Sequence, residues 1–106
     1  MRATRRDINH SQVGEIFAKC GWTMIDSASF FQCGQAGFPD WMATRGVVTI
    51  YIEVKNGFST KLTKHEVQWR ADHPRLIYLV VRTDEGAKAA AERLARWADK
   101  VQAPTL

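Results

Sequence analysis

The chain has 106 residues, a length that suits one domain with a modest hydrophobic core. Its hydrophobic content of 45% is ordinary for a globular protein, and its net charge of +4 suits a polyanionic partner. The sequence shows neither a run of transmembrane length nor a signal peptide, so we expect no membrane association. Cys20 and Cys33 do not have metal-ligand spacing and are too few for a disulfide framework, so we expect two reduced thiols.

The N-terminal residues 1–7 form a basic arm, and a helix is predicted to follow it. The arm could lie along DNA phosphates or be a frayed, solvated end, and its arginines are Arg2, Arg5 and Arg6. The helix is predicted from Asn9 or Ser11 to about Cys20, ending at Gly21. Its apolar residues recur at helical spacing and make one stripe: Val13, Ile16, Phe17 and Cys20.

A first strand is predicted from Trp22 to Asp26, followed by a polar loop from Ser27 to Ala36. Phe30 and Phe31 lie in this loop, directly before the next strands. They could stack on unpaired bases, or they could cover a core edge or a dimer partner.

The stretch from Gly37 to Lys55 is predicted to form a β-hairpin, because two apolar runs flank a turn signal at Thr44-Arg45-Gly46. Residues that lie opposite each other share a face, and side chains alternate along each strand. A two-residue turn at Arg45-Gly46 places Asp40 opposite Tyr51, and a two-residue slip places it opposite Glu53. In either register the charged side chains share one face and the apolar ones share the other: Asp40, Glu53 and Lys55 against Ile50, Ile52 and Val54.

Two carboxylates and an ammonium on one face are unfavourable unless they have a use, and a divalent metal is the obvious one. Mg²⁺ takes hard oxygen ligands, often one or two carboxylates, and completes its shell with water and phosphate. Such a metal polarises a phosphoryl oxygen and lowers the pKa of bound water. Lys55 could then hold or help deprotonate the attacking water, or stabilise charge on the phosphate. The alternative is a surface ion pair of Lys55 with Glu53 or Asp40.

The C-terminal half is predicted to contain helix, strand and helix. Thr63 and Glu66 form a capping signature for a helix that runs to about Asp72. Leu76 to Val81 is predicted as a buried strand, and Thr83-Asp84 starts a last helix through about Lys100. The inward stripe of that helix is Ala87, Ala90, Ala91, Leu94, Trp97, Ala98 and Val101, and residues 102–106 are a loose tail. The order of elements predicts an α/β architecture with a mixed sheet.

The run GFPD, about a dozen residues and then IEVK resembles the PD-(D/E)xK nucleases, the restriction-endonuclease-like superfamily. The following NGFSTKLTKHEVQW resembles its VRR-NUC branch, in particular small stand-alone phage or prophage members. The resemblance runs from about Asp7 to Glu92. It implies one nuclease domain over residues 1–106 with a mixed sheet flanked by helices, in the cytoplasm of a bacterial or phage-infected cell. It also implies DNA cleavage with Mg²⁺ or Mn²⁺ and no small-molecule cofactor.

By this resemblance Asp40 and Glu53 would bind the metal with the backbone carbonyl of Val54, and Lys55 would position or activate the water. Members of the superfamily usually carry a glutamate on the first helix. Gln12 stands where many related small nucleases have it, flanking the apolar stripe, whereas Glu15 points nearly opposite the stripe. Gln12 has the better geometry and Glu15 the better charge, although Glu15 also suits a solvated residue paired with Lys19.

Further polar residues follow Lys55 along the chain. Glu66 stands where the family has a glutamine or glutamate that helps organise the site, although the capping signature explains it without chemistry. Gln68 is a second supporting candidate. Lys61 and Lys64 add positive charge that could position DNA phosphates.

We therefore expect a structure-selective endonuclease acting on branched DNA such as Holliday junctions. A four-way junction needs two symmetric cuts, so we expect a two-fold homodimer with the loop before Phe38 near the contact. The contact would bury some of the aromatic residues that look exposed: Phe30, Phe31, Trp41 and Phe58. A monomeric nickase is the alternative assembly. The alternative function is a catalytically weak or inactive nucleic-acid-binding domain, which Gln12 in place of glutamate would favour. A third is a partner-binding protein whose hairpin charges are merely solvated.

Overall fold

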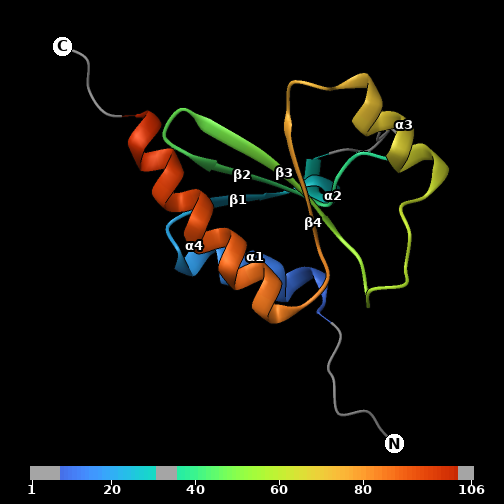
Figure 1. Cartoon of the computed structure of the whole chain (residues 1–106), viewed down its shortest axis with the longest axis horizontal. Coiled ribbons are helices and arrows are strands. Elements are labelled where there is room, and N and C mark those ends of the chain that lie inside the picture. The colour runs from blue at the N-terminus through green and yellow to red at the C-terminus, as the bar shows by residue number, and fades with distance from the viewer. Residues whose placement is uncertain (1–7, 31–35, 103–106) are drawn as a thin grey trace, which may run out of the picture.

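A four-stranded mixed sheet forms the centre of the fold, with helices on its two sides (Figure 1). The computed structural model describes residues 8–30 and 36–102, so the predicted roles of Arg2, Arg5, Arg6 and Phe31 lie outside the described residues, as does Cys33. The strands stand in the order β1 (Thr23–Asp26), β2 (Trp41–Arg45), β3 (Val48–Val54) and β4 (Ile77–Val81). β1, β2 and β3 pair antiparallel, and β4 pairs parallel to β3. The predicted α/β architecture with a mixed sheet is confirmed.

The longer helices begin at the caps that the sequence indicates. α1 (His10–Lys19) starts after Asn9, whose side chain accepts from the backbone N–H of Gln12. α3 (Lys64–Asp72) starts after Thr63, and α4 (Asp84–Val101) starts after Thr83. Each cap accepts a backbone N–H of the first turn that has no partner within the helix, which fixes where the helix starts.

The main hydrophobic core lies between one face of the sheet and the pair α1 and α4. Phe17, Ile50 and Ile52 are fully buried there, and each such side chain stabilises the fold by about 1.5–3 kcal/mol. α4 contributes small residues to this core: Ala87, Ala91, Ala95 and Ala98. Trp22 closes one side and donates from its indole N–H to the carbonyl of Ala91, at 3.1 Å.

The prediction that Trp97 and Val101 belong to the inward stripe of α4 is wrong. Trp97 is 42% exposed and Val101 is 48% exposed, whereas Ala95 is buried. Successive helix residues turn by about 100°, so Trp97 points well away from its buried neighbour Ala98. Hydrophobic character alone placed it in the stripe.

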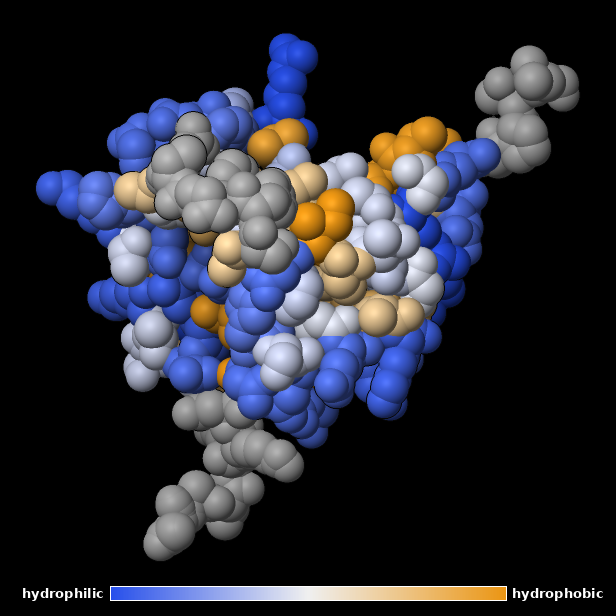
Figure 2. All heavy atoms as spheres, turned by 180° about the vertical axis from the view of Figure 1, so that it is seen from behind, coloured by the Kyte–Doolittle hydropathy of each residue, from blue (hydrophilic) through white to orange (hydrophobic). Residues whose placement is uncertain are grey.

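Trp41 is also not the exposed aromatic that the sequence suggested for a dimer contact. Its ring stacks on the His10 ring with centroids 4.6 Å apart, and its indole N–H donates to the His10 carbonyl at 3.0 Å. Phe58, in contrast, is 68% exposed. The face in Figure 2 is largely hydrophilic with small, separate hydrophobic patches.

The remaining differences are local. The predicted loop from Ser27 begins with a short helix, α2 (Ser27–Phe30), and Asp26 accepts from the backbone N–H of Ala28 there. The β2–β3 turn is Gly46-Val47, where Gly46 has φ of +63°, a conformation that glycine adopts without strain. Cys20 is a free thiol. Within the described ranges, no helix is long and apolar enough to cross a membrane.

Candidate metal centre

The register of the β2–β3 hairpin brings the predicted carboxylates together. Trp41 pairs with Ile52, so the same register continued by one residue sets Asp40 opposite Glu53. The Asp40 carboxylate accepts from the backbone N–H of Val54 at 2.8 Å. Of the two registers considered from the sequence, the structure has the slipped one, and the shared face of Asp40, Glu53 and Lys55 is retained because the slip is an even number of residues.

This face of the sheet lies opposite the α1–α4 core and is covered by α3. Trp69 of α3 packs against Tyr51 and Tyr78, with ring centroids 5.7 Å and 6.0 Å apart. Phe38, just before β2, completes the aromatic cluster at 5.2 Å from Trp69. Tyr51 and Tyr78 of this cluster lie on the same face of the sheet as Glu53.

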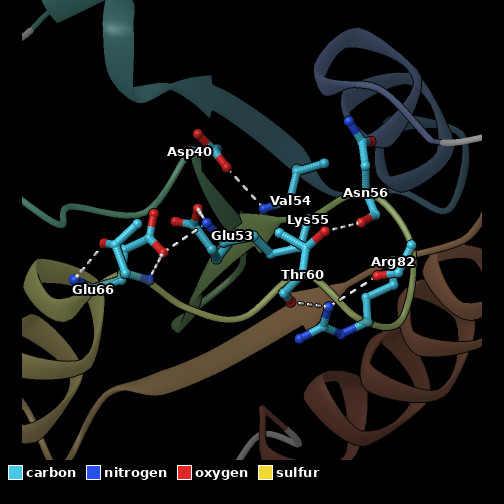
Figure 3. A network of polar contacts seen from close by, with 10 residues as sticks. Asp40, Glu53, Val54, Lys55, Asn56, Thr60, Glu66 and Arg82 are labelled. Atoms are coloured by element: carbon cyan, nitrogen blue, oxygen red, sulfur yellow. Dashed lines mark hydrogen bonds and ion pairs between the residues drawn. The ribbon is translucent and has the colours of Figure 1, made fainter.

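Glu66 of α3 is the closest partner of Lys55 (Figure 3). The Lys55 ammonium lies 2.7 Å from Glu66 Oε1 and 3.8 Å from Glu53 Oε2. The same Oε1 accepts from the backbone N–H of Thr63 at 2.7 Å, which closes the capping box of α3. Glu66 therefore has a structural role and an electrostatic role at once, and the capping signature alone had shown only the first.

The site holds more acidic groups than basic ones, because Lys55 pairs with both Glu53 and Glu66 and Asp40 adds a third carboxyl group. Glu53 is 4% exposed, and its burial raises its pKa to about 9, with the charge of Asp40 and a hydrogen bond to Glu66 adding to the effect. Burial alone would lower the pKa of Lys55, but its hydrogen bond to Glu66 and the charges of Glu66, Glu53 and Asp40 together raise it. Burial alone would raise the pKa of Glu66, but hydrogen bonds from Lys55, the Thr63 backbone and Glu53, with the charge of Lys55, together lower it. Lys55 and Glu66 thus form a charged pair, and Glu53 is the carboxyl group whose pKa is raised.

A hard divalent cation fits this donor set. Glu53 Oε1 is buried and makes no hydrogen bond within residues 8–30 and 36–102. Such an atom is unfavourable unless a ligand or water contacts it. No three His, Cys, Asp or Glu side chains of the described part gather as a complete metal cluster, so carboxylates would supply only part of the shell. Mg²⁺ commonly binds in this way, with water and phosphate filling the other positions.

The other predicted site residues have separate contacts. The side-chain oxygen of Gln12 accepts from the backbone N–H of Asn9 at 3.0 Å, so it completes the capping box of α1. Glu15 is exposed, and Gln68 donates to Asp72 at 2.8 Å. The roles of Gln12, Glu15 and the Val54 carbonyl at a metal stay predictions. Lys61 and Lys64 are exposed beside the start of α3 and are accessible to a polyanion.

Arg82 is a residue of this region that the sequence reading missed. It follows β4, and its guanidinium donates to the carbonyls of Gly57 and Thr60 (Figure 3). The Thr60 hydroxyl in turn donates to the Asn56 carbonyl. These bonds fix the loop that follows Lys55. Because parallel neighbours such as β3 and β4 end at one edge of the sheet, the position of Arg82 directly after the predicted strand was the available signal.

Comparison of the sequence with models of known protein families gives no match, and comparison with curated proteins gives none either.

Proposed function

We propose that this chain is a metal-dependent DNA endonuclease with a restriction-endonuclease-like fold, which hydrolyses phosphodiester bonds in branched DNA. The observation that carries the proposal is the buried Glu53 Oε1, which makes no hydrogen bond within the described residues, in a side chain set beside Asp40 and Lys55 on one face of the hairpin. A divalent cation would neutralise the negative charge of buried carboxylates that have too few cationic partners. The resemblance of GFPD and IEVK to the PD-(D/E)xK motif supplies the reaction class.

In this proposal Asp40 and Glu53 hold Mg²⁺ or Mn²⁺ with the Val54 carbonyl. When bound, the cation supplies Lewis-acid polarisation of the phosphate and lowers the pKa of water. Lys55 donates hydrogen bonds toward the phosphate or the attacking water and stabilises the negative charge that develops during in-line attack. Its raised pKa keeps it protonated, which favours this role over proton abstraction. Glu66 orients the ammonium from 2.7 Å away.

The basic residues next to the site would hold the DNA backbone. Lys61 is exposed before α3 and Lys64 is exposed at its first residue, where they could contact phosphates on either side of the cut. Such contacts fix the position of DNA without reading its sequence. Selectivity for branched DNA and a two-fold homodimer belong to the same proposal, and both come from the resemblance.

The second candidate is a nucleic-acid-binding domain that has lost catalysis. Gln12 favours it, because a neutral amide replaces the expected glutamate and is already used in the capping box of α1. A weaker metal site would then leave binding without cleavage.

A cleavage screen separates these candidates. Labelled duplex, flap, splayed and four-way-junction DNA are incubated with wild type and Lys55→Met in Mg²⁺, Mn²⁺ or EDTA. The proposal predicts metal-dependent cuts by the wild type, strongest on a branched substrate, and loss of cutting in Lys55→Met. DNA binding without cutting on all four substrates supports the second candidate. Neither binding nor cutting would refute both.

A further inference from the structure

Two buried side-chain oxygens on neighbouring strands lack hydrogen-bond partners within the described residues: Glu53 Oε1 on β3 and the hydroxyl of Tyr78 on β4. In the β3–β4 register Glu53 pairs with Val80, and Tyr51 pairs with Tyr78. Tyr78 therefore stands two residues before the partner of Glu53. Because side chains alternate along a strand, Tyr78 and Glu53 project from the same face of the sheet.

The ring of Tyr78 is held firmly in place. Trp69 packs on it with centroids 6.0 Å apart, and the Arg70 guanidinium carbon lies 5.0 Å from its ring centroid. The packing leaves the ring little freedom, so the position of its hydroxyl is set by the fold. A hydroxyl that merely ended up in a loose part of the core would not be fixed in this way.

The surroundings make this hydroxyl a hydrogen-bond donor. Burial raises the pKa of Tyr78, the charges of Glu53 and Glu66 raise it further, and Arg70 opposes them only in part. The hydroxyl thus keeps its proton in the electrostatic field of the metal-centre carboxylates. The two oxygens do not hydrogen-bond each other. A group that bridges them would accept from the Tyr78 hydroxyl and donate to Glu53 Oε1, and water does both.

We propose that Tyr78 is a positioning residue for Glu53, and that its hydroxyl orients the Glu53 carboxylate through a bridging water for cation binding. Carboxylates that bind metals are themselves held by hydrogen bonds, and loss of such a partner typically weakens metal affinity 10- to 100-fold. This inference rests on the proposed function, since it assigns Glu53 to a cation. It adds a residue outside the hairpin, from the strand that pairs with it.

The test uses Tyr78→Phe with Tyr51→Phe as its matched control. Both changes remove one hydroxyl from the same aromatic cluster and keep the ring, and the Tyr51 hydroxyl is not among the buried unpaired groups. Mn²⁺ affinity is measured by calorimetry on metal-free protein, and thermal unfolding checks that each variant is folded. We expect Tyr78→Phe to weaken Mn²⁺ binding about 10- to 100-fold and Tyr51→Phe to change it by less than about threefold.

A second readout distinguishes positioning from general damage. A positioning role predicts that cleavage by Tyr78→Phe needs more Mg²⁺ for half-maximal rate but returns toward the wild-type rate at saturation. Equal Mn²⁺ affinity in wild type and folded Tyr78→Phe would overturn this inference and leave the proposed function intact. A wild type that binds no Mn²⁺ would overturn both.

Discussion

Replacing Glu53 by glutamine keeps the shape of the side chain and removes its titration, so it tests whether the buried Glu53 carboxyl makes the stability of the protein depend on pH. The pKa of Glu53 is about 9 in the folded protein against an ordinary value of 4.5. The folded state therefore binds this proton more tightly than the unfolded state. The contribution of neutral Glu53 to stability is fully present below pH 4.5 and is lost as the pH rises toward 9.

The size of the effect follows from this difference. Each pH unit between the two values removes up to about 1.4 kcal/mol of unfolding free energy, which sets an upper limit of about 4 kcal/mol near pH 7.5. Relaxation and water penetration give real sites a higher effective dielectric constant than dry protein, which reduces the effect. We therefore expect Glu53→Gln to stabilise the metal-free protein near pH 7.5 by less than this limit of about 4 kcal/mol and to have little effect near pH 4.5.

Urea unfolding in EDTA at several pH values measures this directly, with Glu15→Gln as a control that changes an exposed glutamate. Wild type and the control should lose stability as the pH rises, and Glu53→Gln should lose most of that dependence. A Glu53→Gln protein that is less stable than wild type near pH 7.5, or that keeps the full pH dependence of stability, would refute the raised pKa assigned to Glu53.

Lys55→Met should keep Mn²⁺ binding and DNA affinity but lower cleavage about 10²- to 10³-fold, as loss of one transition-state donor does; a fully active variant in a nicking assay would remove Lys55 from catalysis. Gln12→Glu should tighten Mn²⁺ binding measured by calorimetry without loss of stability, because a glutamate also completes the capping box. Glu15→Ala should change neither the Mn²⁺ affinity nor the stability. If Glu15→Ala weakens Mn²⁺ binding and Gln12→Glu does not tighten it, Glu15 is the ligand. Light scattering with junction DNA should give the mass of a dimer, and Phe58→Ser should weaken this dimer because Phe58 is an exposed aromatic residue of the predicted contact. A monomeric mass of the wild type would contradict the dimer.

The set of side chains that share one face of the hairpin was predictable, although the position of its turn was not. The turn is Gly46-Val47 and not Arg45-Gly46, which slips the strand register by two residues. A slip by an even number of residues preserves which side chains share a face. The same rule places Trp41 on the face opposite Asp40, toward α1, so its burial followed from the pattern. The exposure predicted for Trp41 came from the amount of aromatic surface that so small a domain can cover, without that rule.

The contacts of the site with later elements were harder to predict, because they join residues far apart in the chain. Glu66 reaches Lys55 across eleven positions, and no local pattern shows that α3 folds back over β3. Tyr78 belongs to a run of apolar residues that predicts burial but not the face on which each residue lies. Its place beside Glu53 follows only from the parallel register of β3 and β4.

Calorimetric titration of the metal-free protein with Mn²⁺, comparing wild type with Asp40→Asn, tests the central claim most directly. Asparagine keeps an oxygen that can accept from the Val54 N–H, so the change removes the charge and leaves that contact available. The proposed metal centre predicts saturable Mn²⁺ binding by wild type and at least a tenfold loss of affinity in Asp40→Asn. Wild type that binds no Mn²⁺, or an Asp40→Asn protein that binds it equally well, would contradict a metal centre on this hairpin.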